Sequence, residues 1–595
     1  MPPKITQRIA DFDNSQFSDG IPPLLQRIYL GRGVTSDQQL DRSLARLPKP
    51  DSLKGLSEGI NLLAEALQQQ QSVLIVGDFD ADGATSTTLT LLAMRALGMQ
   101  HIDFIVPNRF EYGYGLTPEI VALAQQQDPD LIITVDNGIS SVSGVKAAKE
   151  AGIKVLITDH HLPGMEIPDA DAILNPNQHH CEFPSKNLAG VGVVFYLLSA
   201  LRGHLRTSGW FTDNNLPEPN MAEWLDLVAL GTVADVVPLD QTNRVLVHQG
   251  LQRIRAGKTR PGIQALLDLA GKDRQRLVAA DMGFALGPRL NAAGRLDDMS
   301  IGIECLLASD EYLAREYAVQ LDELNRDRRV IEAEMQREGL AILDQLNLDR
   351  STEGETDLPW GLCLFDENWH QGVVGLLASR IKDRVHRPVI AFADASSVDI
   401  NSKGEEDNLA DKEYKGSARS IPGLHIRDAL EAVASSNPQL ISKFGGHAMA
   451  AGLSLKASNY PDFAKAFDTE VRSRLNPADL EAEVATDGEL APEQLNLETG
   501  YLLRDAGPWG QHFPEPLFEG EFYIVQQRIV GEKHLKLLLA VDEQRQQLID
   551  AIAFNIDTHQ WPNTHVDKIQ LIYKLDLNLW QGRESVQLMV EAILT

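Results

Sequence analysis

Short apolar runs alternate with helix-like segments over residues 71–176. The apolar runs, rich in Val and Ile and bounded by turn residues, are SVLIVGD, HIDFIVPNR, DLIITVDNG, IKVLITDHH and DAILNPN. Between them lie segments with helical spacing, such as TSTTLTLLAMRALG and TPEIVALAQQQ. This alternation predicts βαβ units and a doubly wound parallel sheet. Sheets of this kind bind ligands in the crevice at the carboxyl ends of their strands.

The rest of the chain has two other patterns. A proline-free stretch with helical spacing predicts one long helix between two lobes, although an ordinary surface helix would explain its charges too. After the linker STEGETDLP, a second α/β unit is expected, followed by strand-like pieces that predict a small β-barrel. We therefore expect an N-terminal segment at residues 1–50 and a sheet domain at 51–309. The long helix would cover 310–346, the second α/β domain 355–460 and the barrel unit 461–595.

Composition narrows the class of protein. The 595 residues are 43% hydrophobic and 23% charged, as in globular proteins with several cores. No apolar run is long enough to span a membrane, MPPKITQRIADFDNS lacks the apolar region of a secretory signal, and three cysteines fit a reducing compartment. We expect a cytoplasmic protein without a membrane partner. The formal charge of -30 argues against a protein that covers nucleic acid independently of its sequence, because such a protein needs a basic face. The charge is compatible with a nuclease that has a locally basic channel.

The segment VLIVGDFDADG places Asp78, Asp80 and Asp82 at alternating positions before Gly83. The pattern D-x-D-x-D-G begins an EF-hand calcium loop, which needs a glutamate at position 12 and helical flanks. Position 12 is Leu89 and the preceding apolar run is strand-like, so an EF-hand is excluded. In an extended turn, Asp80 and Asp82 would point to the same side, and Gly83 would let the chain turn closely into the next helix.

Other apolar runs also end in side chains that can bind a metal. They are Asp136 in TVDNG, Asp159, His160 and His161 in TDHH, and Asp235 in GTVADVVPL. Any one aspartate could instead cap a helix or a turn, and one histidine could be buried while the other is exposed. Several carboxylates at one sheet edge repel each other, however, and a cation would hold them together.

The ligand types favour Mn²⁺, with Mg²⁺ as the alternative, and the absence of cysteine argues against structural zinc. About five ligands exceed what one catalytic ion needs from the protein. We therefore expect two ions bridged by a shared aspartate, an arrangement that activates water and stabilises the leaving oxygen in phosphoryl transfer.

In this order, DFDADG, VDNG, DHH and GTVADVVPL resemble the four successive motifs of the DHH phosphoesterase superfamily. The later segments LGPRLNAAGRLDD, WHQGVVGLLASRI, GSARSIPGLHIRDAL and FGGHAMAAGLSL are similar to motifs of its bacterial single-strand-specific 5′→3′ DNA exonucleases. PWGQHFPEPLFEG resembles the join to their C-terminal OB-fold. The resemblance, which covers the chain from about residue 50, implies an α/β fold: a doubly wound parallel-sheet DHH domain, a connecting helix, a smaller DHHA1 domain and an OB-fold barrel.

The resemblance also implies roles for individual residues. The residues that match metal ligands are Asp80, Asp82, Asp136, His160 and Asp235. Asp78 and Asp159 would support these ligands without binding the metal themselves. His161 would lie beside the scissile phosphate as a proton donor or charge stabiliser, so that His161, Asp159 and Asp136 form the expected catalytic set. The GGH signature, Gly445, Gly446 and His447, matches a substrate-binding element on the second lobe.

Several basic and polar residues are candidates for contacts with DNA, because guanidinium groups bind phosphate through two hydrogen bonds. We expect contacts to the strand backbone and its 5′-terminal phosphate from Arg109, Arg289, Asn291, Arg295, His370, Ser417 and Arg419. For each arginine taken singly, a structural ion pair is an equally good explanation. Lys533, His534 and Lys536 in the β-rich unit are candidates for contacts with a single strand.

The predicted activity is metal-dependent, processive removal of 5′-mononucleotides from single-stranded DNA by a monomer. The resemblance suggests work in repair and recombination beside a single-strand-binding protein and a RecQ-type helicase. Three alternatives stay open: a DHH enzyme acting on pyrophosphate or short oligonucleotides, a scaffold without catalysis, and a nucleic-acid-binding module without hydrolysis. Relatives that act on small substrates are usually shorter and lack the β-rich unit, and the metal motifs of a scaffold would be expected to decay.

Overall fold

The computed structural model describes residues 4–11, 15–108, 112, 114–352, 358–395 and 412–594. Its first domain contains a five-stranded sheet in the order β3-β2-β4-β5-β6, in which every pairing is parallel. The strands are β2 (Val73–Gly77), β3 (Ile102–Ile105), β4 (Leu131–Val135), β5 (Lys154–Thr158) and β6 (Ala172–Leu174). The parallel sheet predicted from the alternating runs is confirmed.

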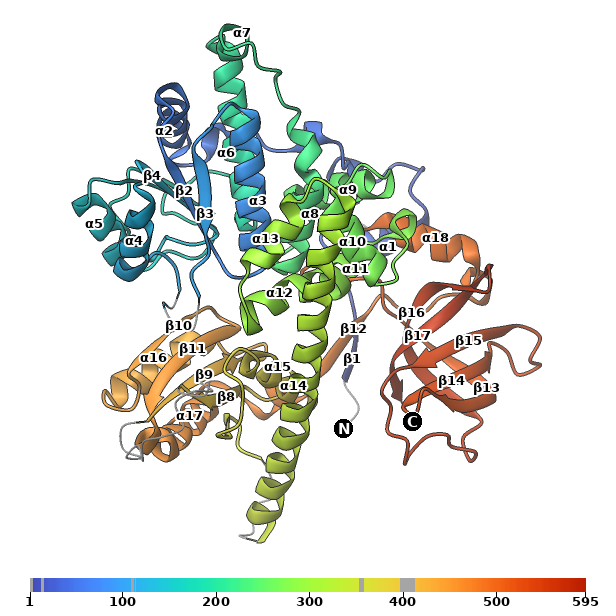
Figure 1. Ribbon diagram of the computed structural model, residues 1–595. Helices are drawn as coiled ribbons and strands as arrows, with labels where there is room; N and C mark the ends of the chain where they lie inside the picture. The colour runs from blue at the N-terminus through green and yellow to red at the C-terminus, as the bar shows by residue number, and fades with distance from the viewer. Residues whose placement is uncertain are drawn as a thin grey trace.

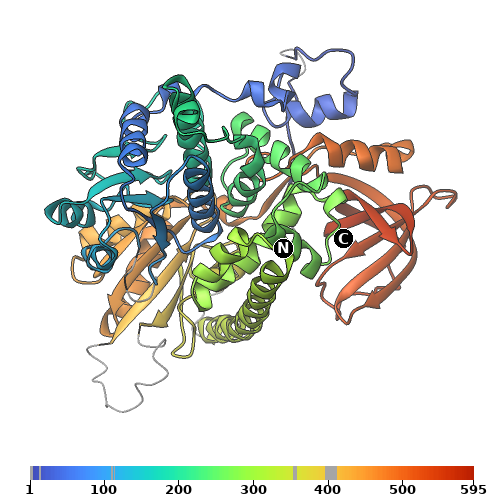
Figure 2. The ribbon, with the colours of Figure 1, turned by 45° about the horizontal axis from the view of Figure 1, so that its top comes forward.

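Helices cover both faces of this sheet (Figures 1 and 2). They are α2 (Leu56–Gln69), α3 (Ala81–Ala96), α4 (Pro118–Ala124), α5 (Val142–Glu150) and α6 (Gly190–Thr207). Successive residues of β2 belong to different cores: Ile75 packs with the α2, α3 and α6 side, and Leu74 packs with the α4 and α5 side. Burial on both faces explains why β2 is an unbroken apolar run rather than an alternating one.

A helical region follows the sheet and leads into one long helix, α14 (Glu311–Thr352). The region includes α8 (Leu225–Ala234), α9 (Gln241–Arg255), α10 (Pro261–Leu269), the single π-helical turn η8 (Met282–Leu286), α12 (Gly287–Leu296) and α13 (Ser300–Leu307). α14 packs on α10, α12 and α13 and then on α15 (Val374–Val385) of the next domain, so it connects the two lobes (Figure 1).

The second α/β domain has a smaller, mixed sheet in the order β10-β11-β9-β8-β7. Its elements are β7 (Leu362–Phe365), α15 (Val374–Val385), β8 (Val389–Asp394), β9 (Glu413–Arg419), α16 (Ile426–Ser436), β10 (Lys443–Gly446), β11 (Ala450–Lys456) and α17 (Tyr460–Arg474). β7 and β8 are parallel, and the other pairings are antiparallel. This domain lies against the carboxyl ends of the first sheet (Figure 1).

Five strands form a closed barrel in the order β13-β14-β15-β17-β16, which confirms the predicted barrel. They are β13 (Phe518–Val530), β14 (His534–Ala540), β15 (Leu548–Ala553), β16 (Lys568–Trp580) and β17 (Arg583–Leu594). Closure pairs both edges of what would otherwise be an open sheet, and irregular pairing near Ile524 and Ile572 marks bulges that bend the long strands.

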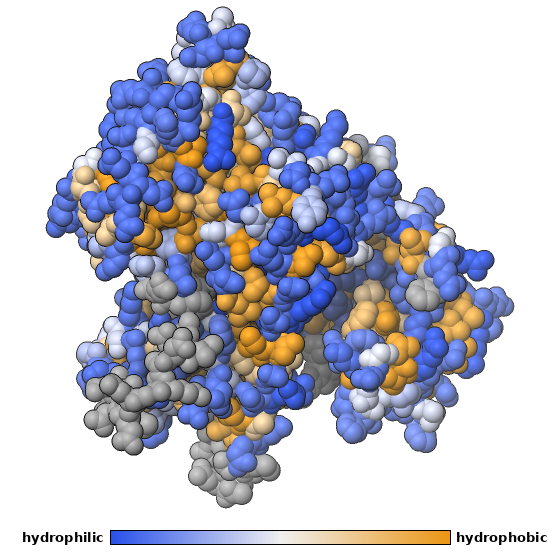
Figure 3. Space-filling view, viewed as in Figure 1, coloured by the Kyte–Doolittle hydropathy of each residue, from blue (hydrophilic) through white to orange (hydrophobic). Residues whose placement is uncertain are grey.

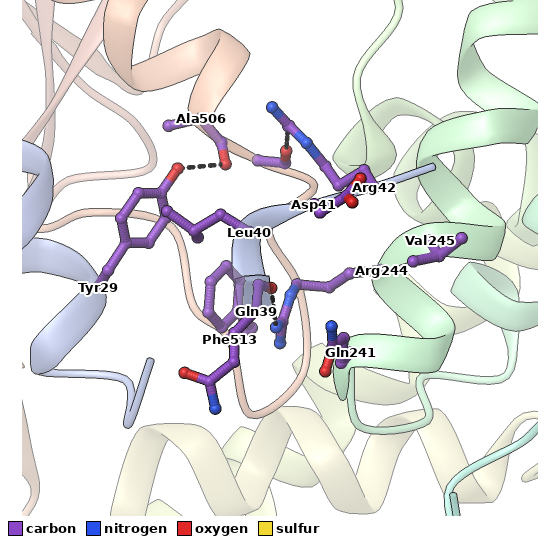
Figure 4. A pocket seen from close by; sticks show the side chains of 11 residues that line it. Tyr29, Gln39, Leu40, Asp41, Arg42, Gln241, Arg244, Val245, Ala506 and Phe513 are labelled. Atoms are coloured by element: carbon purple, nitrogen blue, oxygen red, sulfur yellow. Dashed lines mark hydrogen bonds between the residues drawn. The ribbon is translucent and has the colours of Figure 1, made fainter. Parts of the chain in front are cut away.

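The N-terminal segment contacts the barrel unit and so connects it to the rest of the molecule. Four elements make this contact: β1 (Lys4–Gln7), α1 (Pro23–Leu30), β12 (Glu483–Thr486) and α18 (Leu497–Ala506). β1 pairs in parallel with β12. The Tyr29 hydroxyl donates to the Ala506 carbonyl at 2.9 Å (Figure 4), and Arg32 and Asp487 form an ion pair at 2.6 Å with both side chains 1% exposed.

Hydrophilic side chains cover most of the face in Figure 3, with an apolar area near its middle, where Figure 1 places α12 and α14. Among the described residues, no helix combines the length and the apolar character that a membrane span requires.

Candidate metal centre and active site

Loops at one edge of the first sheet bring the acidic motifs together. Asp78 follows β2, Asp136 follows β4 and Asp159 follows β5, and these three strands are neighbours in the sheet. Asp235 ends α8, which packs on α3. Parallel strands present their carboxyl ends at the same edge, so residues distant in sequence meet there.

Three overlapping groups of side chains offer ligand atoms within 4.8 Å of one another. The groups are Asp78, Asp80 and Asp136; Asp82, His160 and Asp235; and Asp136, His160 and His161. His160 Nε2 lies 3.1 Å from Asp136 Oδ1 and 3.4 Å from Asp235 Oδ2. The five predicted ligands therefore lie together, and Asp136 and His160 join the first two groups.

Asp80 and Asp82 reach the site by a route that differs from the sequence prediction. Asp80 is the N-cap of α3, where its Oδ1 accepts hydrogen bonds from Asp82 N and Gly83 N at 2.9 and 3.0 Å. Asp82 already belongs to the first turn of α3 and accepts from the backbone at the start of α6. Alternation in an extended turn is thus the wrong explanation, and the two carboxylates join different ligand groups.

Two glycines allow the close packing behind these loops. A Cβ on Gly83 would lie 2.4 Å from the Asp78 carbonyl oxygen, which explains why the chain can turn so tightly into α3. A Cβ on Gly294, in the NAAGR motif, would lie 1.7 Å from the Phe79 carbonyl oxygen. The α12 motif therefore presses directly on the loop that carries the aspartates.

The chemistry of the donor set fits divalent cations. Asp136 Oδ1, His160 Nε2 and Asp235 Oδ2 are buried and have no hydrogen-bond partner among the described residues, because their short mutual distances lack hydrogen-bond geometry. Burial and the Asp235 charge raise the pKa of Asp82 to about 7, and burial and the Asp80 charge raise the pKa of Asp235 to about 8. Carboxylates that resist ionisation together need a cation to balance their charge.

Burial, with the charges of Asp82, Asp80 and Asp235, also raises the pKa of Asp136 well above its usual range. Burial and the nearby His161 lower the pKa of His160, so its imidazole is neutral and its Nε2 can donate a lone pair to a metal. Carboxylate oxygens with one imidazole are the ligands that Mn²⁺ and Mg²⁺ accept.

The Asp159 carboxylate stabilises the DHH loop, residues 159–161, through hydrogen bonds. Its Oδ1 accepts from His160 N, His161 N and His161 Nδ1 at 2.7, 3.0 and 2.7 Å, and its Oδ2 accepts from Ile139 N at 2.8 Å. Burial opposes ionisation of Asp159, but the hydrogen bond and charge of His161 outweigh it and lower the pKa of Asp159 to about 2. Asp159 belongs to none of the three ligand groups, which agrees with a supporting role.

His161 is oriented from several sides. Burial alone would lower its pKa, but the hydrogen bond and charge of Asp159 raise it to about 9. The Tyr114 hydroxyl lies 3.2 Å from His161 Nδ1 and donates to the Asp136 carbonyl at 3.2 Å. The His447 ring of the second α/β domain stacks on His161, with the centroids 5.7 Å apart. Both domains thus contribute to one site.

Sequence reasoning missed two asparagines that position the DHH loop. Asn175 Nδ2 donates to the His161 carbonyl at 2.8 Å, and Asn177 Nδ2 donates to the His160 carbonyl at 2.6 Å. Both lie in the segment DAILNPN directly after β6. The available signal was a pair of amide side chains at the end of a strand that neighbours the DHH strand.

Some of the residues predicted to contact DNA belong to the first domain, and the others belong to the second. Arg289 forms a buried ion pair with Asp322 of α14 at 2.9 Å, so the structural ion pair that the sequence left open for this residue is present. Asn291 Oδ1 accepts from Ala81 N at 2.8 Å at the start of α3. Arg295 donates to the Gly372 carbonyl at 3.1 Å and so bridges the two domains. Arg109 lies outside the described residues.

The remaining candidates lie on the second domain. Arg419 Nη1 donates to Ser417 Oγ at 3.0 Å, and both residues belong to β9. Gly445 and Gly446 end β10 just before His447, and a Cβ on Gly445 would meet open space. His370 lines a cavity of about 280 Å³ between the two domains, and burial lowers the pKa of its imidazole.

Comparison with known proteins adds the family. The chain matches the DHH family, N-terminal domain, over residues 72–232, the DHHA1 domain over 360–473 and the RecJ OB domain over 486–592. It is 54% identical to the single-stranded-DNA-specific exonuclease RecJ of Dickeya dadantii, with 97% of both chains covered. It is 53% identical to the RecJ of Escherichia coli, with 96% of both chains covered. The chain belongs to the RecJ family.

A solved RecJ structure resembles the whole molecule. The crystal structure of RecJ from Thermus thermophilus in complex with Mn²⁺ matches with a TM-score of 0.78 and 28% identity, covering 100% of this chain and 79% of that chain. The same RecJ in complex with Mg²⁺ matches with a TM-score of 0.73 and 26% identity. RecJ proteins have thus been solved with both ions that the sequence predicted, and this chain has the residues to hold them.

Proposed function

We propose that this chain is a metal-dependent exonuclease that removes 5′-mononucleotides from the 5′ end of single-stranded DNA. The observation that carries the proposal is the pair of ligand groups joined through Asp136 and His160 at the sheet edge. Paired sites of hard ligands are the arrangement that phosphodiester hydrolysis uses. Membership of a family named for single-stranded-DNA-specific exonucleases supports the substrate class.

The residues assigned to the two ions are Asp78, Asp80, Asp82, Asp136, His160 and Asp235. When bound there, Mn²⁺ or Mg²⁺ supplies positive charge and lowers the pKa of water. The protein residues hold this charge in place: the N-terminus of α6 and the first turn of α3 fix Asp82 and Asp80, and Asn177 fixes the His160 backbone.

His161 is the residue that we assign to the scissile phosphate. Its Nδ1 is bound by Asp159 Oδ1 at 2.7 Å, so its Nε2 is the nitrogen left to face the substrate. A pKa of about 9 keeps the ring protonated at neutral pH. A protonated imidazole stabilises the charge that develops on the phosphate oxygens and donates a proton to the departing oxygen.

The β9 and α15 region of the second domain is the proposed anchor for a terminal phosphate. A Cβ on Gly375, in the first turn of α15, would lie 2.8 Å from Arg419 Nη2 and 2.9 Å from Ser417 Oγ. A guanidinium, a hydroxyl and a helix N-terminus therefore meet at one place, and this combination binds phosphate. An anchor across from the metal centre supports removal of nucleotides from a phosphorylated 5′ end.

The proposal extends to the setting of the reaction. The strand would pass between the two domains in a channel that excludes duplex and is basic on an otherwise acidic protein. The enzyme would act as a monomer in the cytoplasm, in repair and recombination, with a single-strand-binding protein and a RecQ-type helicase as partners.

A time course on single-stranded DNA labelled at either end tests the proposal. Mn²⁺-dependent release of the 5′ label before the 3′ label is expected, with mononucleotides as products. Early release of the 3′ label would overturn the polarity. Efficient cleavage of dinucleotides or pyrophosphate, with long single strands left intact, would favour a small-substrate DHH enzyme, and binding of DNA without Mn²⁺-dependent cleavage would favour a binding module.

A further inference from the structure

Val236, directly after Asp235, has an unusual backbone conformation. Its φ is +61°, and in the described part of the chain it is the one β-branched residue among the non-glycine residues with positive φ. β-branched side chains are strained in this left-handed region, whereas aspartate, as at Asp136 with φ +62°, tolerates it.

The position of Val236 is one that glycine normally occupies. α8 ends at Ala234, Asp235 is its C-cap, and Val236 N donates to the Val233 carbonyl at 3.2 Å. The next residue after such a cap is usually glycine, because glycine adopts positive φ without strain. A valine therefore stands where the helix end itself favours another residue.

Packing does not account for the valine either. Val236 as a residue is 61% exposed, so it buries little apolar surface within the protein. Strain at a functional site indicates a role when the strained side chain contributes little to stability.

Two other exposed apolar residues are close in sequence to residues of the same site. Leu162 follows His161 and is 53% exposed, and Met449 lies two residues after His447 and is 46% exposed. Consecutive Cα atoms are about 3.8 Å apart, so Leu162 and Val236 each lie one residue length from a residue of the metal centre, and Met449 lies within two residue lengths of His447, which stacks on His161. We name these three residues the apolar rim.

The residues of the metal centre are polar, and they explain how the site binds cations and phosphate but not how it binds a base. A nucleotide at the cleavage point also carries a base with two flat, apolar faces, and apolar or aromatic side chains bind such faces without regard to sequence. We propose that Val236, within the apolar rim, contacts the nucleobase next to the scissile phosphate and contributes to binding of the strand. This inference rests on the proposed exonuclease function.

The variant Val236→Gly separates a binding contact from a structural role. Glycine relieves the strain, so the variant should melt within about 2 °C of the wild type or above it. Its KM for single-stranded DNA should rise about tenfold with little change in kcat, because a contact made equally in the bound and transition states is lost. Calorimetric Mn²⁺ binding should stay within about twofold of the wild type, because the Asp235 backbone keeps its conformation.

A substrate without bases completes the test. On oligonucleotides whose residues at the cleaved end are abasic, wild type and Val236→Gly should have equal KM values. Val236→Asn, which tolerates positive φ but offers a polar side chain, should behave like the glycine variant.

The inference is overturned if Val236→Gly loses thermal stability, if its KM is unchanged on normal DNA, or if its defect persists in full on abasic DNA. These results differ from failure of the proposed function, in which the wild type itself would not degrade single-stranded DNA.

Discussion

The imidazole rings of His161 and His447 stack with their centroids 5.7 Å apart and their planes at 23°, although they belong to different domains. Replacing His447 with alanine should remove one side of the support for His161 while leaving the ligand groups intact. We expect a loss of about 10²-fold in kcat/KM, as for other positioned acid–base groups. Steady-state kinetics checks this, and unchanged Mn²⁺ binding serves as the control. Wild-type kinetics for His447→Ala would show that the stack has no role.

Asp136 belongs to two ligand groups, so its loss should disable both. We expect Asp136→Ala to lower Mn²⁺-dependent cleavage by at least about 10³-fold while binding of single-stranded DNA is retained. Asp169→Asn is the matched control, because Asp169 precedes β6 at the opposite edge of the sheet and its side chain is 94% exposed. Full cleavage by Asp136→Ala would refute the metal assignment.

Metal removal should make stability depend on pH. Burial raises the pKa of Asp82 to about 7 and that of Asp235 to about 8, so without metal the folded protein holds protons that the unfolded chain releases above its ordinary carboxyl pKa of about 4. The unfolded state binds fewer protons in this range, so stability falls as pH rises from about 4 to about 8.

Bound Mn²⁺ replaces these protons, and its stabilising effect should therefore grow as pH rises over the same range. Melting temperatures of chelated and Mn²⁺-loaded protein at several pH values test this expectation. The double variant Asp82→Asn with Asp235→Asn should have a weaker pH dependence in the chelated state, with the remainder due to Asp136 and His161. A pH-independent increment from Mn²⁺ would contradict the shared-carboxylate centre.

Arg289 and Arg419 were both predicted from the sequence to contact DNA, but their alanine variants should have different effects. Arg289→Ala removes the inter-helix partner of the buried Asp322, which keeps its ion pair with Arg326. The free energy of unfolding should therefore fall by about 2 kcal/mol. Arg419→Ala should instead raise the KM for 5′-phosphorylated DNA about tenfold with little change in melting temperature. Thermal melting and kinetics on both variants give the contrast, and a reversed pattern would exchange the two roles.

Local patterns predicted the parts of the structure that depend on local chemistry. The apolar run of β2 identified a strand buried on both faces, and the order of the acidic motifs predicted that Asp80, Asp136 and Asp235 meet at one edge. Neither prediction needed the contacts between domains, because parallel topology alone brings strand ends together.

Residues whose role depends on distant partners were harder to predict. The sequence could not distinguish an ion pair from a phosphate contact for Arg289, because Asp322 is one of many acidic residues on α14. Asp78 was expected behind the ligands, yet its carboxylate lies within reach of Asp80 and Asp136. The exact direction of a carboxylate depends on turn geometry, and Gly83 makes this turn tighter than an extended chain would allow.

The pairing of β1 with β12 has a consequence for synthesis of the protein. Lys4 pairs with Glu483, so this strand leaves the ribosome long before its partner exists. At about 5–20 residues per second, the wait is about half a minute to a minute and a half, during which the sheet domain can fold first. The N-terminal segment should therefore be protease-sensitive on nascent chains that end before β12 and become protected once the barrel unit has been made.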